Sequence, residues 1–272
     1  MIMISARKEF WDSTKLSDMD EIREVNLTDE SLGSVVDKQK LLAKVSGKNV
    51  LLLVHGYNNE EDDVVRAYNI IEANIINLLK RGDGSPIYDT IIGYSWPGGD
   101  DPLDYYSAKR RASAVAPRFA NWLTAIRSTA SSLDVMGHSM GCRVSLLALN
   151  GTSQGTSPVR NLYLTAAAVD NESIELGEEY YSSTNSCNGA YVFHSKNDTV
   201  LSLSYLGAER DKALGYSGPE NPADIIEHSS NVKVINCKNV VFKHGGYKDC
   251  TGMYTYISRE FSGLPAPQYF TL

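Results

Sequence analysis

Long apolar runs are missing from this chain of 272 residues, and no stretch approaches the length that a membrane-spanning helix needs. The first residues, MIMISARKEFWD, reach Arg7, Lys8 and Glu9 before the apolar core of a signal peptide can form. Positive charge is also scarce, because 26 Lys and Arg stand against 33 Asp and Glu. The net charge of −7 disfavours the basic surface that nucleic acid or an anionic membrane requires. We therefore expect a soluble, cytoplasmic protein with no nucleic-acid partner and no transmembrane segment.

Cysteine is equally sparse, and the four residues form no C-x-x-C pair: Cys142, Cys187, Cys237 and Cys250. This spacing suits neither a zinc site nor a redox motif. Reduced, mostly buried thiols are the expected state. We expect no metal site and no cofactor, and the sequence leaves the oligomeric state open.

What the chain does have is an alternation of short apolar or β-branched runs with longer segments of helical period. This pattern is typical of an α/β fold with a mostly parallel central sheet flanked by helices on both faces. Strands are predicted at 49–57, 88–96, 132–139, 161–170, 189–198 and 232–242, and helices at 61–82, 103–126 and 140–151. Pro117 is expected to start a new helix or to kink the second of these helices.

The domain organisation is predicted to be simple, with a single domain over residues 1–272. Residues 1–48 are less regular, and we expect one or two antiparallel edge strands there. Residues 199–230 are longer than a crossover helix needs and contain glycine, proline and acidic residues. They predict a small cap or a loop insertion.

A serine between two glycines stands where a predicted strand turns into a predicted helix. The sequence GHSMG places Gly137 and Gly141 two positions before and after Ser139. A nucleophile on such a sharp turn has strained backbone angles, and the turn leaves little room for side chains at those two positions. The following helix presents its amino terminus to developing negative charge. We therefore predict that Ser139 is a nucleophile.

A serine nucleophile needs a base and an acid, which in this kind of fold follow it in the order Ser, Asp or Glu, His. The predicted strand GAYVFHSKND ends at Asp198, and the next one runs into FKHGGY, which contains His244. We predict that His244 is the base and that Asp198 orients it. His228 is the alternative base, and Asp170, at the end of the preceding strand, is the alternative acid.

The remaining histidines are expected to play other parts. His138 is expected to point away from its neighbour Ser139, and His194 lies inside a predicted strand, where a core histidine is the simpler interpretation. His55 is followed by glycine in the loop HGYNN and is expected to orient that loop.

An oxyanion hole takes one backbone N–H from the residue after the nucleophile and a second from a loop after an earlier strand. Met140 is predicted to supply the first donor, and Tyr57 in the loop HGYNN the second. Asn58 and Trp96 are predicted to line the substrate pocket, because pockets for small molecules combine apolar walls with a few polar groups.

Several short motifs occur together in this order: HGYNN, YSWPGG, GHSMGCR, AAAVD, HSKND and GAERDKALGYSGP. As a set they resemble a bacterial and phage branch of the α/β-hydrolase superfamily known as a domain of unknown function. The likeness covers the chain from about residue 48 onward. It implies an α/β-hydrolase fold, a triad of Ser139, Asp198 and His244, and oxyanion donors at Tyr57 and Met140. The acidic beginning and the KHGGYKD surroundings of the histidine depart from that branch.

Two functions from different classes fit this sequence. The first is a serine hydrolase of the carboxylesterase or lipase type, which acts on a small-molecule ester through an acyl-enzyme. The second is a non-catalytic member of the same fold that binds a ligand or partner. Every chemical part is present in the right order, which favours the hydrolase. Thioesterases, amidases and peptidases use the same parts, so the sequence leaves the bond type open.

Overall fold

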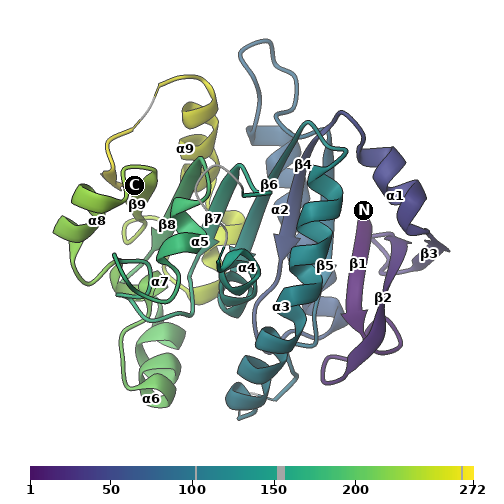
Figure 1. Cartoon of the computed structure of the whole chain (residues 1–272), viewed down its shortest axis with the longest axis horizontal. Helices are drawn as coiled ribbons and strands as arrows, with labels where there is room; N and C mark the ends of the chain where they lie inside the picture. The colour runs from purple at the N-terminus through teal and green to yellow at the C-terminus, as the bar shows by residue number, and fades with distance from the viewer. Residues whose placement is uncertain (102, 152–156, 265) are drawn as a thin grey trace.

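The computed structural model describes residues 1–101, 103–151, 157–264 and 266–272. A twisted sheet of ten strands, in the order β10-β9-β8-β7-β6-β4-β5-β1-β2-β3, forms the centre of the molecule (Figure 1). The predicted fold class is confirmed. The strands after residue 48 are parallel: β4 Asn49–Val54, β5 Thr90–Ser95, β6 Ser132–His138, β7 Asn161–Thr165, β8 Gly189–His194, β9 Val232–Asn236 and β10 Tyr269–Thr271.

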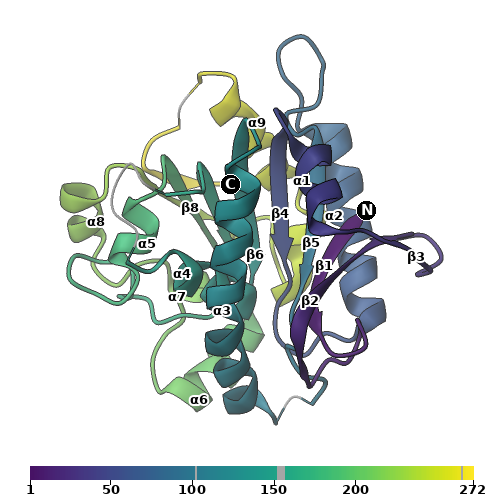
Figure 2. The same cartoon turned by 45° about the vertical axis from the view of Figure 1, so that its right-hand side comes forward.

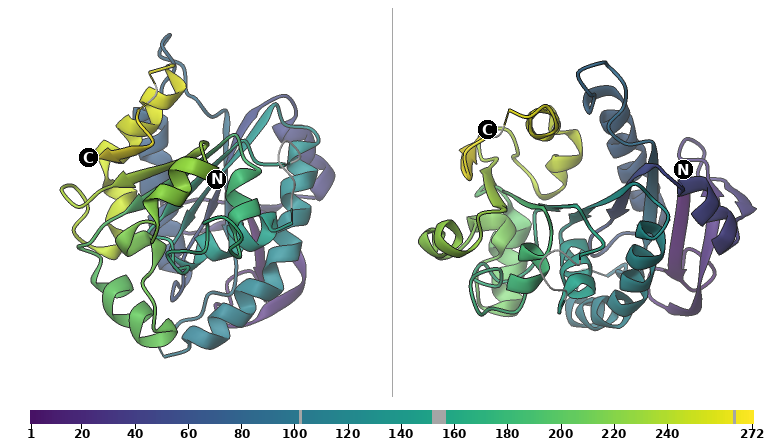
Figure 3. Two further views of the ribbon diagram at one scale, coloured as in Figure 1. Left: turned by 60° about the vertical axis from the view of Figure 1, so that its left-hand side comes forward. Right: turned by 45° about the horizontal axis from the view of Figure 1, so that its top comes forward.

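Helices cover both faces of the sheet (Figure 3). One face carries α2 Glu61–Leu78 and α9 Thr251–Phe261, and the other carries α1 Lys38–Val45, α3 Tyr105–Arg127, α4 Met140–Leu149 and α5 Tyr181–Asn185. Strand β4 shows why the sheet is buried on both sides. Its residues Val50, Leu52 and Val54 point into one apolar core, and Leu51 and Leu53 point into the other.

The amino-terminal segment differs from its prediction. It forms three strands, β1 Ile2–Arg7, β2 Leu16–Val25 and β3 Leu32–Val35, where one or two edge strands were expected. Strand β2 runs antiparallel to both of its neighbours, β1 and β3 (Figure 2). Strand β1 is fully buried and pairs in parallel with β5, so it belongs to the interior of the sheet.

Pro117 lies inside α3, and no new helix starts there. The lost backbone hydrogen bond is outweighed by packing on either side of the proline, because Val115, Ala116 and Phe119 are all buried in the core.

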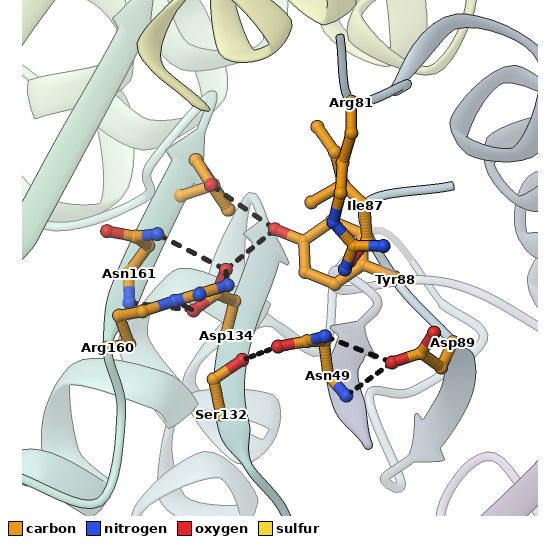
Figure 4. Close-up of polar contacts among 10 residues, drawn as sticks. Asn49, Arg81, Ile87, Tyr88, Asp89, Ser132, Asp134, Arg160 and Asn161 are labelled. Carbon is orange, nitrogen blue, oxygen red and sulfur yellow. Dashed lines mark hydrogen bonds and ion pairs between the residues drawn. The ribbon is translucent and has the colours of Figure 1, made fainter. Parts of the chain in front are cut away.

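Buried polar groups at the amino ends of the central strands are paired with one another (Figure 4). The fully buried carboxylate of Asp134 in β6 accepts hydrogen bonds from Arg160 Nε at 2.9 Å and Nη2 at 2.8 Å. Tyr88 Oη and the Asn161 backbone N–H also donate to it, at 2.8 Å and 3.0 Å. A buried charge is tolerated when it is paired and hydrogen-bonded in this way.

Residues 199–230 form four short helices between β8 and β9: η1 Val200–Tyr205, which is π-helical, α6 Leu206–Glu209, α7 Leu214–Ser217 and α8 Pro222–His228. Two contacts join α6 to the start of α3. Lys109 Nζ pairs with Glu209 Oε1 at 2.7 Å, and Tyr106 Oη donates to the Ala208 carbonyl at 2.6 Å. The cap role stays a prediction. Within the described ranges, no helix is both long and apolar enough to cross a membrane.

Candidate active site

Ser139 occupies the turn between β6 and α4 with φ 54° and ψ −124°, a region that residues other than glycine rarely adopt. The neighbouring glycines make this turn possible. A Cβ atom on Gly141 would lie 2.3 Å from the His55 carbonyl oxygen and 2.4 Å from that of Val54, and one on Gly137 would lie 3.0 Å from the Cys142 nitrogen. The turn therefore has the geometry that the GHSMG motif predicts.

Hydrogen bonds to strand β7 and to the residues just after it hold the turn at Ser139 in place. The Ser139 N–H donates to the Thr165 carbonyl at 3.0 Å, and the Thr165 hydroxyl donates to the Gly137 carbonyl at 2.8 Å. The Ser139 carbonyl accepts from the Ala168 N–H at 3.2 Å. Because the backbone is fixed on both sides, the side chain of Ser139 is held at the carboxyl end of the strand.

Asp198 and His244 lie together although 46 positions separate them. Their Oδ2 and Nδ1 atoms are 2.7 Å apart, and the Asp198 side chain is fully buried. The other carboxylate oxygen of Asp198 accepts from the Leu201 N–H at 3.0 Å. A carboxylate only accepts, so Nδ1 of His244 holds a hydrogen and Nε2 of a neutral ring is left as the basic atom.

The alternative base and acid have other partners. His228 lies on α8, where its Nε2 is 3.8 Å from Asp224 Oδ1. Asp170 Oδ1 accepts from the Tyr205 hydroxyl at 2.7 Å. The structure therefore brings neither residue into the Asp198–His244 pair.

His138 has a contact that the sequence did not reveal. Its Nε2 donates to the His244 carbonyl at 3.0 Å, and the two ring centres are 4.7 Å apart. Burial, followed by the nearby charge of His244, lowers the pKa of His138 to about 4, so this ring is neutral near pH 7. No local pattern could predict a contact across 106 positions.

The two predicted oxyanion donors, Met140 and Tyr57, adjoin the Ser139 turn. Met140 is the first residue of α4, so no carbonyl of that helix accepts from its N–H. In the described part of the chain, no residue accepts from the Tyr57 N–H. The adjoining Gly56 packs against the turn, since a Cβ atom there would lie 2.9 Å from Ser139 Cβ. Asn58 also has a positive φ of 54°, and its buried Oδ1 has no partner among the described residues.

A family model described as an α/β hydrolase of unknown function (DUF900) matches residues 33–242. The chain belongs to this family. An uncharacterized protein of Nostoc sp., alr1448, is 27% identical in an alignment 119 residues long, and the match covers 38% of this chain and 31% of that protein. The chain thus matches under a third of that relative's length.

Solved structures with a similar chain path include two esterases. Esterase PE8 is 14% identical with a TM-score of 0.47, and the match covers 79% of this chain and 94% of that one. Est1E from Butyrivibrio proteoclasticus is 10% identical with a TM-score of 0.40, and the match covers 80% and 89% of the two chains.

Trp96 of this DUF900 protein is fully buried beside the loop after β4, and its part in the substrate pocket stays a prediction. Its indole Nε1 donates to the His55 carbonyl at 2.8 Å, and its ring stacks on the His55 ring with 5.8 Å between centres. Trp96 therefore supports the loop that carries Tyr57.

A cavity of ≈ 130 Å³ lies beside the candidate site, between α2 and η2 His244–Asp249. Its wall is mainly apolar and includes Ala67, Ile71, Met136, Tyr247 and Met253. His138, Gly56 and Gly245 also line it, and these residues adjoin Ser139, Tyr57 and His244. A protein cavity of about this volume can bind a molecule the size of benzene.

The cysteines are all free and buried in this DUF900 protein. Burial raises the pKa of the Cys187 thiol to about 11, so it is not a reactive thiolate near pH 7. Among the residues that the structure describes, no three or more His, Cys, Asp or Glu side chains are grouped so that they could hold a metal ion.

Proposed function

We propose that this protein is a serine hydrolase that cleaves carboxylic esters with Ser139, His244 and Asp198. The observation that carries the proposal is the 2.7 Å pair of His244 Nδ1 and Asp198 Oδ2, and the strained backbone of Ser139, with φ 54°, supports it. Asp198 fixes the imidazole tautomer in which Nε2 can accept a proton. Ser139 lies in the strained turn at the carboxyl end of β6.

The reaction follows from these groups. His244 Nε2 takes the proton of the Ser139 hydroxyl while Oγ forms a bond to the ester carbonyl carbon. The resulting oxyanion accepts hydrogen bonds from the Tyr57 and Met140 N–H groups. When the tetrahedral intermediate collapses, the ester C–O bond breaks and His244 returns its proton to the departing alcohol. Water then attacks the acyl-enzyme with the same proton transfers and releases the acid.

The cavity beside the site supports a small acyl group. Its volume of ≈ 130 Å³ is suited to a chain of about six carbons or fewer. Its apolar wall favours an aliphatic or aromatic acyl group over a charged one.

A panel of p-nitrophenyl esters, from acetate to dodecanoate, tests the proposal. We expect measurable kcat/KM for the short esters, a decline beyond about six carbons, and loss of turnover in Ser139→Ala. Turnover that persists in Ser139→Ala would contradict the proposed function. A preference for dodecanoate would contradict only the proposed acyl size.

A further inference from the structure

We propose that Arg7, on strand β1, is a positioning residue for the oxyanion hole and acts through His55 on the peptide that carries the Tyr57 N–H. The inference rests on the proposed function and adds a part that the sequence gave no reason to expect. It joins the amino-terminal strand to a loop about 50 positions away along the chain.

Arg7 is a buried cation whose hydrogen bonds go to neutral groups. It is 1% exposed, and its Nε donates to the Trp96 carbonyl at 3.0 Å. Its Nη2 lies 2.9 Å from the Asn59 carbonyl oxygen and 3.1 Å from His55 Nε2. Burial lowers its pKa to about 10, and the nearest carboxylates act on it only through space. Burying a charge in this way is unfavourable, so packing alone does not account for an arginine here.

The hydrogen bonds of His55 fix which of its nitrogens carries the hydrogen. Arg7 Nη2 and the Trp96 N–H, 3.1 Å from Nε2, can only donate, so Nε2 accepts. Nδ1 therefore carries the hydrogen and donates to the Gly56 carbonyl at 2.8 Å. Burial and then the charge of Arg7 hold the pKa of His55 well below its usual value, which keeps the ring neutral.

The Gly56 carbonyl and the Tyr57 N–H belong to one peptide group. Because the peptide is planar and trans, holding the carbonyl oxygen on one side fixes the direction of the N–H on the other. A hydrogen bond to the carbonyl also polarises the amide and makes its N–H a better donor. Arg7 holds the other end of the loop through the Asn59 carbonyl, and Asn59 Nδ2 donates to the Tyr57 carbonyl at 2.6 Å. The loop is thus held before substrate arrives.

The arginine lies outside the part of the chain that matches the family model, residues 33–242. Strand β1 pairs in parallel with β5, and Ser5 lies opposite Ser95, the residue before Trp96. This pairing brings Arg7 close to Trp96. Arg7 is the last residue of β1, so it lies at the same edge of the sheet as the loop after β4.

Arg7→Lys tests the inference directly, because lysine keeps the charge but lacks the planar fork of donors. Loss of one oxyanion donor in a known hydrolase costs about 10²- to 10³-fold in kcat, so a misaligned donor is expected to cost about 10- to 100-fold. We expect this loss in kcat with KM changed by less than about 3-fold, since the donor acts on the transition state. Amide hydrogen exchange in the 55–59 loop should become faster.

Arg160→Lys is the control, since Arg160 is a partly buried arginine that binds Asp134 at the amino ends of the strands, away from the loop. We expect it to lower the melting temperature while leaving kcat per folded molecule and exchange in the 55–59 loop unchanged. An Arg7→Lys protein with wild-type kcat and wild-type loop exchange would overturn the inference and leave the proposed function standing. Failure of the proposed function shows instead as a wild type without turnover, and loop exchange then still tests Arg7.

If Arg7→Lys does not fold, variants of His55 test the inference instead. In His55→Asn the amide nitrogen can replace the Nδ1 donor to the Gly56 carbonyl, whereas in His55→Gln the amide group lies nearer the Nε2 position. We expect His55→Asn to retain about 10-fold more kcat than His55→Gln. Equal kcat in the two folded variants would overturn the inference.

Discussion

Ser139 has a strained backbone. Its φ of 54° and ψ of −124° place the backbone in a region that favours glycine, at a cost of about 1–3 kcal/mol for other residues. The strain persists because β7 and the two flanking glycines hold the turn. If the strain is needed to position the hydroxyl, a substitution that relieves the strain will raise the free energy of unfolding and abolish activity.

Ser139→Gly is therefore expected to raise the free energy of unfolding by about 1 kcal/mol relative to Ser139→Ala, since only glycine relieves the positive φ. Both variants should lack esterase activity. Urea unfolding of the two variants measures the difference. Equal stability would show that the turn is unstrained.

The acid can be identified by a pair of single-atom changes. Asp198→Asn replaces the oxygen that accepts from His244 and favours the wrong imidazole tautomer, which lowers kcat by about 10⁴-fold in a known triad. Asp170→Asn keeps an acceptor for the Tyr205 hydroxyl and should change kcat by no more than about 3-fold. Ester hydrolysis by purified, folded variants gives both values. The reverse order would assign the acid to Asp170.

At the scale of elements, the strand-turn-helix from β6 to α4 depends on how closely α4 approaches β4. Gly141 marks the closest approach, with the His55 and Val54 carbonyl oxygens 2.3 Å and 2.4 Å from where its Cβ would lie. Both atoms belong to the backbone, so they cannot move aside as a side chain would. The same approach brings the loop after β4 against Ser139.

Gly141→Ala is expected to destabilise the protein by about 1–3 kcal/mol, because β4 and α4 must separate. The separation would also move the Tyr57 loop, so kcat should fall. Gly207→Ala is the control: it changes a glycine of α6 with nothing within 4 Å of its Cβ position. Thermal unfolding and ester hydrolysis compare the two. A Gly141→Ala protein as stable and active as Gly207→Ala would contradict this account.

Local sequence patterns predicted the elements that depend on local order. The strand, glycine turn and helix around Ser139 are adjacent in sequence, and the parallel strands β4 to β9 show as apolar runs, whereas the short strand β10 was not predicted. Strand β1 was missed as an interior strand because its partner β5 lies about 90 residues further on. Arg7 and His138 were missed for the same reason, since their contacts follow from the order of strands in the sheet.

At the scale of the molecule, buried histidines couple the fold to pH. Burial lowers the pKa of both His138 and His194 to about 4, and that of His55 well below its usual value. In the unfolded chain these rings have a pKa near 6.5. Between about pH 6.5 and pH 4 the unfolded chain therefore binds more protons than the folded one.

The free energy of unfolding is thus expected to fall as the pH is lowered from about 6.5 towards 4, by about 1.4 kcal/mol per pH unit for each such histidine. His194→Gln removes one titrating group that is far from Ser139 in the sequence. It should reduce the slope of unfolding free energy against pH by the contribution of one histidine. Urea unfolding at pH 7 and pH 4.5 measures the slope for wild type and variant. Identical slopes would contradict the assignment of a depressed pKa to His194.

The proposed catalytic parts follow four strands of the sheet: the turn after β6, the loop after β4, Asp198 after β8 and His244 after β9. Intact-mass spectrometry after treatment with a small fluorophosphonate tests this assembly most directly, with wild type and Ser139→Ala measured in parallel. We expect one phosphonyl adduct on wild type and none on Ser139→Ala, because only an activated serine reacts. A folded wild type without an adduct would contradict the account and favour a DUF900 protein that binds without turnover.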